Sequence, residues 1–150
     1  MKLILASNNA HKIEELRQLF SDGAVVLTGL SDWPAIPEPP ETQDTFAGNA
    51  LQKARFVFER TGIMTVADDS GLVVDALDGA PGVYSKRFTP EATAQSNNTR
   101  LLLELSDITQ RTARFVCAMA LVWDGGERVI EGTCEGRIAQ ALRGFGGFGY

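Results

Sequence analysis

Apolar and polar positions along the chain follow two periods, one typical of strands and one typical of helices. Short apolar runs bounded by turn residues predict strands over residues 2–6, 24–27, 64–67, 72–74, 112–123 and 127–135. Apolar residues three and four positions apart predict helices over residues 12–20, 45–61 and 93–105. Strands that alternate with helices and end in a hairpin predict an α/β fold, with a mixed central sheet and flanking helices.

Composition places the chain among ordinary globular proteins and removes several classes of function. Its 150 residues, 44% hydrophobic and 22% charged, suffice for one domain with a real core. A net charge of −5 argues against binding to duplex nucleic acid but leaves room for a small anionic ligand. Apolar runs are too short for a membrane span or signal peptide, and two cysteines are too few for a disulfide framework. We therefore expect a cytoplasmic protein without a nucleic-acid or membrane partner.

A polar loop follows the first predicted strand and leads into the first helix. Its sequence is Ser7-Asn8-Asn9-Ala10-His11-Lys12. Ser and Asn are preferred helix caps, so one interpretation is a simple capped turn. However, His11 and Lys12 fall in the first helical turn, where the helix dipole disfavours cations unless an external anion is present. The alternative is therefore a phosphate cradle of backbone N–H groups, a hydroxyl, an amide and an ammonium, although no Walker A motif is present.

Two adjacent acids, Asp68 and Asp69, directly follow the strand predicted over residues 64–67. They could close an Asx turn with Gly71, or they could form a divalent-metal or general-base site beyond the strand end. Magnesium binds oxygen ligands and often uses only one or two carboxylates. Glu41, in a proline-rich loop, offers a further carboxylate, whereas Lys53 on the long helix would ordinarily be a solvated lysine.

The glycine-rich end matches G-x-G-x-x-G in letters, from Gly144 to Gly149. A dinucleotide-binding role is rejected because no apolar strand leads directly into this segment and no helix follows it. What remains is a glycine loop that carries Phe148 and Tyr150. Aromatic rings on such a loop can stack on a flat base.

Several motifs occur in an order that resembles the inosine triphosphate pyrophosphatase family. They are Ser7-x-Asn9-x-x-Lys12-x-x-Glu15, Glu41-Thr42, Thr45-Phe46-x-x-Asn49-Ala50-x-x-Lys53-Ala54, Ala67-Asp68-Asp69-Ser70-Gly71-Leu72, Gly79-Ala80-Pro81-Gly82-Val83-Tyr84-Ser85 and Gly146-Gly147-Phe148-Gly149-Tyr150. The resemblance implies an elongated two-lobed α/β fold with the active site in a cleft, and a homodimer. It also implies magnesium-dependent hydrolysis of ITP, dITP and XTP to the monophosphate and pyrophosphate.

The same resemblance implies a role for individual residues. Asp69 would be the proton acceptor and a metal ligand, with Glu41 and Asp68 assisting the metal. Ser70 would contact the substrate. The triphosphate would be held by Ser7, Asn8, Asn9, Ala10, His11, Lys12 and Lys53. The base pocket would be lined by Phe148, Gly149 and Tyr150.

The resemblance stops at Tyr150. In the family, this motif is followed by Asp-Pro and later by a lysine and a Ser-His-Arg segment that bind the base. We therefore expect residues 1–150 to be a single pyrophosphatase domain without its C-terminal part. One alternative is a septum-formation-inhibitor-like nucleotide pyrophosphatase, although those proteins carry Ser-Pro-Arg-Arg where this chain has Ser7-Asn8-Asn9-Ala10. A second alternative is a non-catalytic nucleotide-binding module.

Overall fold

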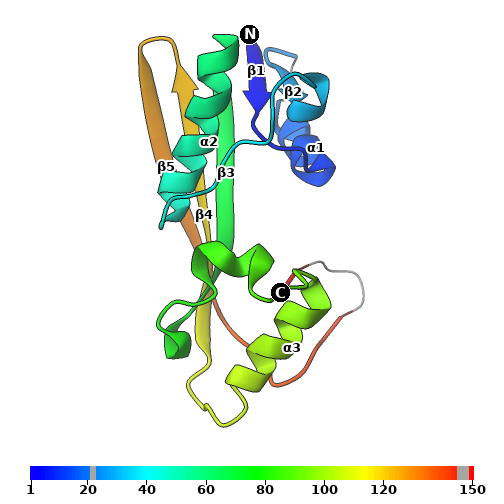
Figure 1. Ribbon diagram of the computed structural model, residues 1–150, viewed down its shortest axis with the longest axis vertical. Helices are drawn as coiled ribbons and strands as arrows, with labels where there is room; N and C mark the ends of the chain where they lie inside the picture. The colour runs from blue at the N-terminus through cyan, green and yellow to red at the C-terminus, as the bar shows by residue number, and fades with distance from the viewer. Residues whose placement is uncertain (21–22, 145–148) are drawn as a thin grey trace. The chain divides into compact units, whose positions relative to one another are not determined.

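The computed structural model describes residues 1–20, 23–144 and 149–150, which are built around a five-stranded sheet (Figure 1). The strand order is β2-β1-β3-β4-β5, and β1 pairs in parallel with both β2 and β3. A two-residue turn joins β4 to β5, so these two strands are antiparallel and the sheet is mixed. This confirms the predicted α/β class. In chain order the elements are β1 (Lys2–Leu5), α1 (Ala10–Leu19), β2 (Val26–Gly29), η1 (Leu30–Asp32), α2 (Phe46–Thr61), β3 (Thr65–Val74), η2 (Asp75–Leu77), η3 (Gly82–Arg87), α3 (Ala94–Glu104), β4 (Thr112–Trp123) and β5 (Gly126–Arg137).

The helices begin and end at capping residues that the sequence makes recognisable. α2 follows Thr45, whose side chain accepts a hydrogen bond from the Gly48 N–H, and it ends at Gly62 in the left-handed conformation, with φ of 63°. Thr93 caps α3 through the Ser96 N–H. These caps explain why the predicted helix boundaries agree with the structure within a residue or two. Within the described ranges, no helix is long and apolar enough to cross a lipid bilayer.

The chain forms two compact units, each with its own hydrophobic core. The first unit comprises residues 1–69 and 118–131, and the second comprises residues 70–117 and 132–150. The core of the first unit includes Leu3, Leu5, Ile13, Leu27 and Val66. The core of the second unit includes Leu72, Val74, Phe88, Leu101, Leu105 and Ala113.

Residues 65–74 form one continuous strand, β3, where the sequence predicts two strands separated by a turn. The expectation of a break was wrong for a clear reason. Asp, Ser and Gly are favoured in turns, and Asp68-Asp69-Ser70-Gly71 consists only of them. In the sheet, however, this segment stays extended, and β3 continues past the end of β1, which pairs with it only at Thr65 and Val66. The interpretation of the two acids as a simple Asx turn is therefore also wrong.

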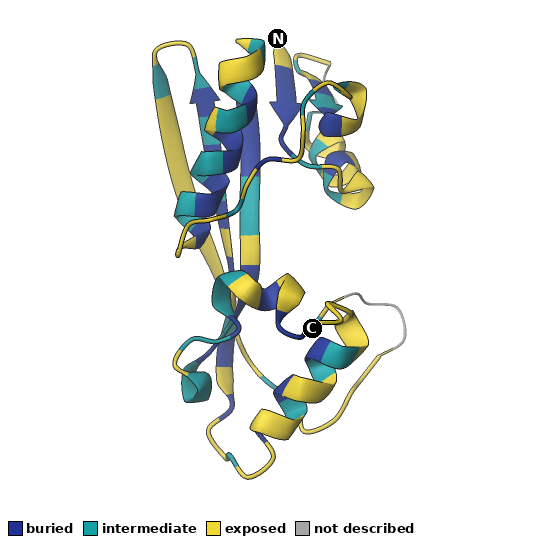
Figure 2. Cartoon of the chain, in the orientation of Figure 1, coloured by how far each residue is buried: buried dark blue, intermediate teal, exposed yellow. Residues whose placement is uncertain are grey.

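β5 is an edge strand of the sheet and is exposed along nearly its whole length (Figure 2). By contrast, buried positions recur along β4. Two large apolar side chains on β5, Val129 and Ile130, are exposed to solvent. A long edge strand of this kind offers unpaired backbone groups to another chain.

Candidate active site

The polar loop after β1 is a capped helix start. Asn9 is the N-cap of α1, and its side-chain oxygen accepts hydrogen bonds from the N–H groups of His11 and Lys12, at 3.0 and 3.4 Å. The Ser7 hydroxyl accepts a hydrogen bond from the Asn9 N–H, at 3.1 Å. The capped-turn interpretation is thus confirmed. Three backbone donors that the cradle interpretation would leave for a phosphate are bonded to side chains of the loop itself.

The side chain of Lys12 leaves this loop and reaches β3. Its ammonium lies 2.5 Å from Oδ2 of Asp68, although 56 positions separate the two residues in the chain. The Lys12 side chain is 40% exposed and that of Asp68 is 12% exposed. The cation is therefore accessible to a ligand from solvent, while the acid is largely shielded.

A second ion pair joins α2 to the proline-rich loop. Lys53 lies on the buried side of α2, and its ammonium is 2.6 Å from Oε1 of Glu41. The Lys53 side chain is 11% exposed, so the expectation of an ordinary solvated lysine was wrong. A largely buried ammonium is stable only beside a compensating charge, which Glu41 provides here.

The remaining acid, Asp69, is bound by an amide from the same helix. Asn49 donates a hydrogen bond from Nδ2 to Oδ2 of Asp69, at 3.0 Å, and its Oδ1 accepts from the Gln43 N–H, at 2.9 Å. Gln52 makes two hydrogen bonds with Thr42, one to its backbone N–H and one to its hydroxyl. Two side chains of α2 therefore hold the loop residues directly after Glu41.

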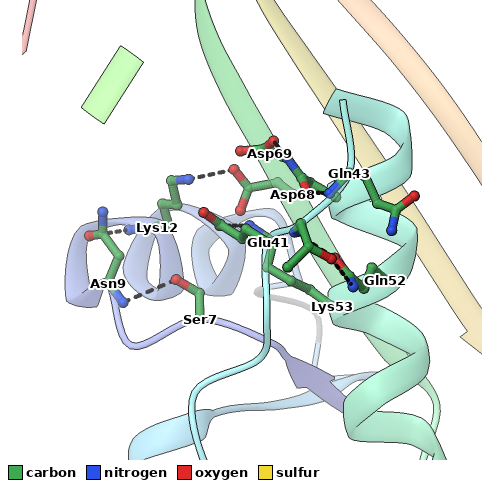
Figure 3. A network of polar contacts seen from close by, with 11 residues as sticks. Ser7, Asn9, Lys12, Glu41, Gln43, Gln52, Lys53, Asp68 and Asp69 are labelled. Carbon is green, nitrogen blue, oxygen red and sulfur yellow. Dashed lines mark hydrogen bonds and ion pairs between the residues drawn. The ribbon is translucent and has the colours of Figure 1, made fainter. Parts of the chain in front are cut away.

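These contacts gather five charged side chains within the first unit of the chain, as Figure 3 shows: Lys12, Glu41, Lys53, Asp68 and Asp69. They come from α1, the proline-rich loop, α2 and β3. Sequence analysis named all five but gave no separate role to Asn49. A polar residue on the buried stripe of a helix, among Phe46, Ala50 and Val57, was the signal that could have singled it out.

The carboxylates of this cluster suit a hard cation in their chemistry, because they supply only oxygen ligands. Asp68 and Glu41 are each bound to a lysine ammonium in the structure. Within the part of the chain that the structure describes, no group of three or more His, Cys, Asp or Glu side chains is arranged as a metal site. A cation at Asp68 or Glu41 would therefore share these oxygens with the lysines or displace them.

The predicted base-pocket residues belong to the second unit of the chain. The Tyr150 hydroxyl donates a hydrogen bond to the Ser85 carbonyl, at 2.8 Å, and burial raises the pKa of this phenol to about 12. The Gly149 carbonyl accepts a hydrogen bond from the side chain of Asn98. Gly149 and Tyr150 line a cavity of about 520 Å³ in this unit. Ser70 is exposed on β3, and Phe148 lies outside the described residues.

Solved structures with the same fold support an assignment to a family. The Ham1 protein of Staphylococcus aureus matches with a TM-score of 0.93 and 36% sequence identity, over all of this chain and 78% of its own. A nucleoside-triphosphatase / dITP/XTP pyrophosphatase from Mycobacterium abscessus matches with a TM-score of 0.89 and 45% identity, over all of this chain and 81% of its own.

Sequence comparison agrees with the structural matches. A dITP/XTP pyrophosphatase of Porphyromonas gingivalis is 48% identical over 151 aligned residues, which cover 99% of this chain and 77% of the relative. A protein of the same name from an Exiguobacterium species is 47% identical over all of this chain and 78% of the relative. The Ham1 family profile matches residues 3–150, that is, almost every residue from β1 to Tyr150. With its fold and nearly its whole sequence matching, the chain belongs to the Ham1 family.

Proposed function

We propose that this protein is a magnesium-dependent pyrophosphatase that hydrolyses ITP, dITP and XTP to the nucleoside monophosphate and pyrophosphate, and so clears these nucleotides from the cellular pool. The observation that carries the proposal is the cluster of Lys12, Lys53, Glu41, Asp68 and Asp69, in a chain nearly half identical to dITP/XTP pyrophosphatases. The two free thiols, Cys117 and Cys134, are in keeping with action in the reducing cytoplasm.

In this proposal the two lysines bind the triphosphate. Its roughly four negative charges need cations nearby, and Lys12 and Lys53 are the ammonium groups of the cluster. Each would exchange its carboxylate partner for a phosphate oxygen. Charge that develops on the departing pyrophosphate would then be stabilised by groups already in place. The loop from Ser7 to His11 would surround the same phosphates.

Asp69 is proposed as the proton acceptor. A water molecule attacks the α-phosphorus, its proton passes to the Asp69 carboxylate, and the bond from the α-phosphorus to the bridging oxygen breaks to release pyrophosphate. Magnesium, held by Asp69 with Glu41 and Asp68, would lower the pKa of bound water and neutralise the phosphates. Asp69 suits this role because one hydrogen-bonded side chain, Asn49, already holds its carboxylate.

The base would be bound by the second unit of the chain, with Phe148, Gly149 and Tyr150 beside it and Ser70 in contact with the substrate. Support comes from the cavity that Gly149 and Tyr150 line, which is large enough to hold a purine. Stacking alone accepts every base. Selection of 6-oxo purines over adenine therefore needs hydrogen bonds to the base edge.

We also propose that the protein acts as a homodimer. The feature in its favour is β5, an exposed edge strand of 12 residues that displays Val129 and Ile130. Pairing with a second copy would cover it. Light scattering on the purified protein should give twice the mass of the chain. The variant Ile130→Lys places a charge on β5 and should shift the measured mass toward that of the monomer. A monomer at all protein concentrations would contradict this part of the proposal.

The activity is tested by incubating the protein with ITP, dITP, XTP and ATP, each in magnesium and in EDTA, and separating the products by anion exchange. We expect equal amounts of monophosphate and pyrophosphate, in magnesium only. Release of orthophosphate with a diphosphate would place the cleavage at a different bond. Nucleotide binding without any product would favour the non-catalytic binding module.

A further inference from the structure

Asn49 contacts the charged cluster and is more deeply buried than any of its five members. It lies on α2 with 1% of its surface exposed, among buried apolar residues of the same helix. Burial of an amide costs free energy unless its polar atoms are hydrogen-bonded. Both ends of this amide are bonded, Oδ1 to the Gln43 N–H and Nδ2 to Oδ2 of Asp69.

The orientation of this amide follows from its partners. A backbone N–H can only donate, so the end of Asn49 that faces Gln43 must be the oxygen. The NH₂ group is then left to face Asp69, whose ionised carboxylate can only accept. The backbone of the loop thus fixes the direction in which α2 presents a donor to β3.

Asn49 also joins the loop that carries Glu41 to the carboxylate of Asp69. Gln43 lies two positions after Glu41 in the loop, and Asp69 is the acid on β3. A single side chain therefore connects the backbone beside one acid to the carboxylate of the other. An amide suits this place, because its N–H stabilises the charge on Asp69 by a hydrogen bond without adding a further cation to the site.

We propose that Asn49 is a positioning residue for Asp69, which holds the carboxylate in the direction needed to accept a proton from the attacking water. The proposal rests on the role given to Asp69 above. Misplacement of a reacting group by about 1 Å can lower a rate by roughly 100-fold. Loss of the Asn49 donor should therefore lower kcat, while the lysines that bind phosphate keep KM nearly unchanged.

The variant Asn49→Asp tests the two ends of the amide separately: the oxygen that binds the loop and the NH₂ group that binds Asp69. The new carboxylate still accepts the Gln43 N–H but meets Asp69 with an acceptor in place of a donor. Gln52→Glu is the matched control, since it makes the same amide-to-acid change three residues along α2. Its partner is Thr42, whose N–H still donates and whose hydroxyl can rotate to donate as well. We expect kcat for ITP to fall roughly 10- to 100-fold in Asn49→Asp and to stay near that of the unaltered chain in Gln52→Glu.

A kcat that is preserved in Asn49→Asp would overturn the proposal, because only the loop contact would then matter. Equal losses in Asn49→Asp and Gln52→Glu would also overturn it, because the effect would be that of any added charge. A rise in KM without a fall in kcat would assign Asn49 to binding and would overturn it as well.

A second measurement does not depend on activity. The double variant Asn49→Asp/Asp69→Asn exchanges donor and acceptor and restores the hydrogen bond between the two positions. We expect Asn49→Asp to lower the thermal midpoint and the exchange to recover most of the loss, with no recovery of kcat. Failure of the exchange to recover stability would overturn the proposal, and so would an exchanged variant that does not fold. If Asp69→Asn alone stays active while the exchange restores stability, the contact stands and the proposed role of Asp69 is the part that fails.

Discussion

The ammonium of Lys12 and the carboxylate of Asp68 form an ion pair at 2.5 Å that joins the start of α1 to the middle of β3. The cation proposed for the triphosphate and an acid proposed for the metal thus neutralise one another. Lys53 and Glu41 repeat the arrangement at 2.6 Å. A ligand that brings only a negative charge therefore competes with a carboxylate for each lysine.

Asp68→Asn should free Lys12 from this competition. We expect metal-free pyrophosphate, in EDTA, to bind roughly three- to tenfold more tightly, because one repelling charge and one competing partner are removed. Magnesium-dependent turnover of ITP should fall in the same variant. Titration calorimetry gives the affinity, and an unchanged or weaker affinity for pyrophosphate would show that the pair does not restrain Lys12.

Lys12→Ala should have the opposite effect and weaken the binding of ligands that carry phosphate, without changing the affinity for ligands that do not. We expect ITP and pyrophosphate to bind at least roughly tenfold more weakly, whereas inosine, which carries no phosphate, should bind as it does to the unaltered chain. Equal losses for inosine and ITP in calorimetry would remove Lys12 from the phosphate site. Arg60→Ala, on the exposed end of α2, is the control for loss of one positive charge.

Asp69→Asn keeps the shape of the side chain and removes the proton acceptor. We expect kcat to fall by about 10² to 10⁴, which corresponds to roughly 3–5 kcal/mol in the activation barrier. Binding of ITP in calcium, measured without turnover, should change far less. A variant that keeps more than a tenth of the turnover would place the proton acceptor elsewhere.

Glu41→Gln should destabilise the fold, because the Lys53 ammonium is largely buried and would lose its counter-charge. Glu41 is itself about one third exposed, so water offsets part of the loss and we expect a decrease of about 1–2 kcal/mol in the free energy of unfolding. Urea denaturation measures it. Glu127→Gln, which breaks the exposed pair with Arg55, is the control and should leave the urea midpoint unchanged.

The Tyr150 phenol should ionise at a higher pH than an exposed tyrosine does. Burial raises its pKa to about 12 from 10.0, while the nearby charge of Arg100 opposes the shift. The raised pKa means that the folded state binds this proton more tightly than the unfolded state does, so its contribution to stability is complete below pH 10 and is lost as the pH rises toward 12. Absorbance at alkaline pH in a Tyr84→Phe background reports Tyr150 alone. A midpoint near 10 would contradict the half-buried position of the phenol.

The helices could be predicted because their signals are local. Thr45 and Gly62 bracket α2, and Thr93 starts α3, so boundaries follow from caps that neighbouring residues complete. β3 could not be predicted as one strand, because its polar centre consists of turn-forming residues that stay extended only as part of the sheet. That information lies in distant parts of the chain.

The charged cluster likewise has features that could be predicted from the local sequence and others that depend on distant contacts. Residue type and motif order indicated its five charged members, but the pairing of Lys12 with Asp68 depends on tertiary contacts across 56 positions. Lys53 resembled a solvated lysine because most helical lysines are, and only its burial against Glu41 corrects that view. The contacts of Asn49 with Gln43 and Asp69 likewise depend on the folded structure, since Asp69 lies 20 positions further along the chain.

α2 sets the geometry of the site by the spacing of two residues. Asn49 and Lys53 are four positions apart, one helical turn, and bind Asp69 and Glu41 respectively. Each residue of a helix advances about 1.5 Å and turns about 100°, so one inserted or deleted residue between them would rotate one anchor away from the site. Exposed positions of the same helix, such as Arg55 and Glu59, can be exchanged freely by comparison. The segment is therefore tolerant of new side chains and intolerant of a change in length.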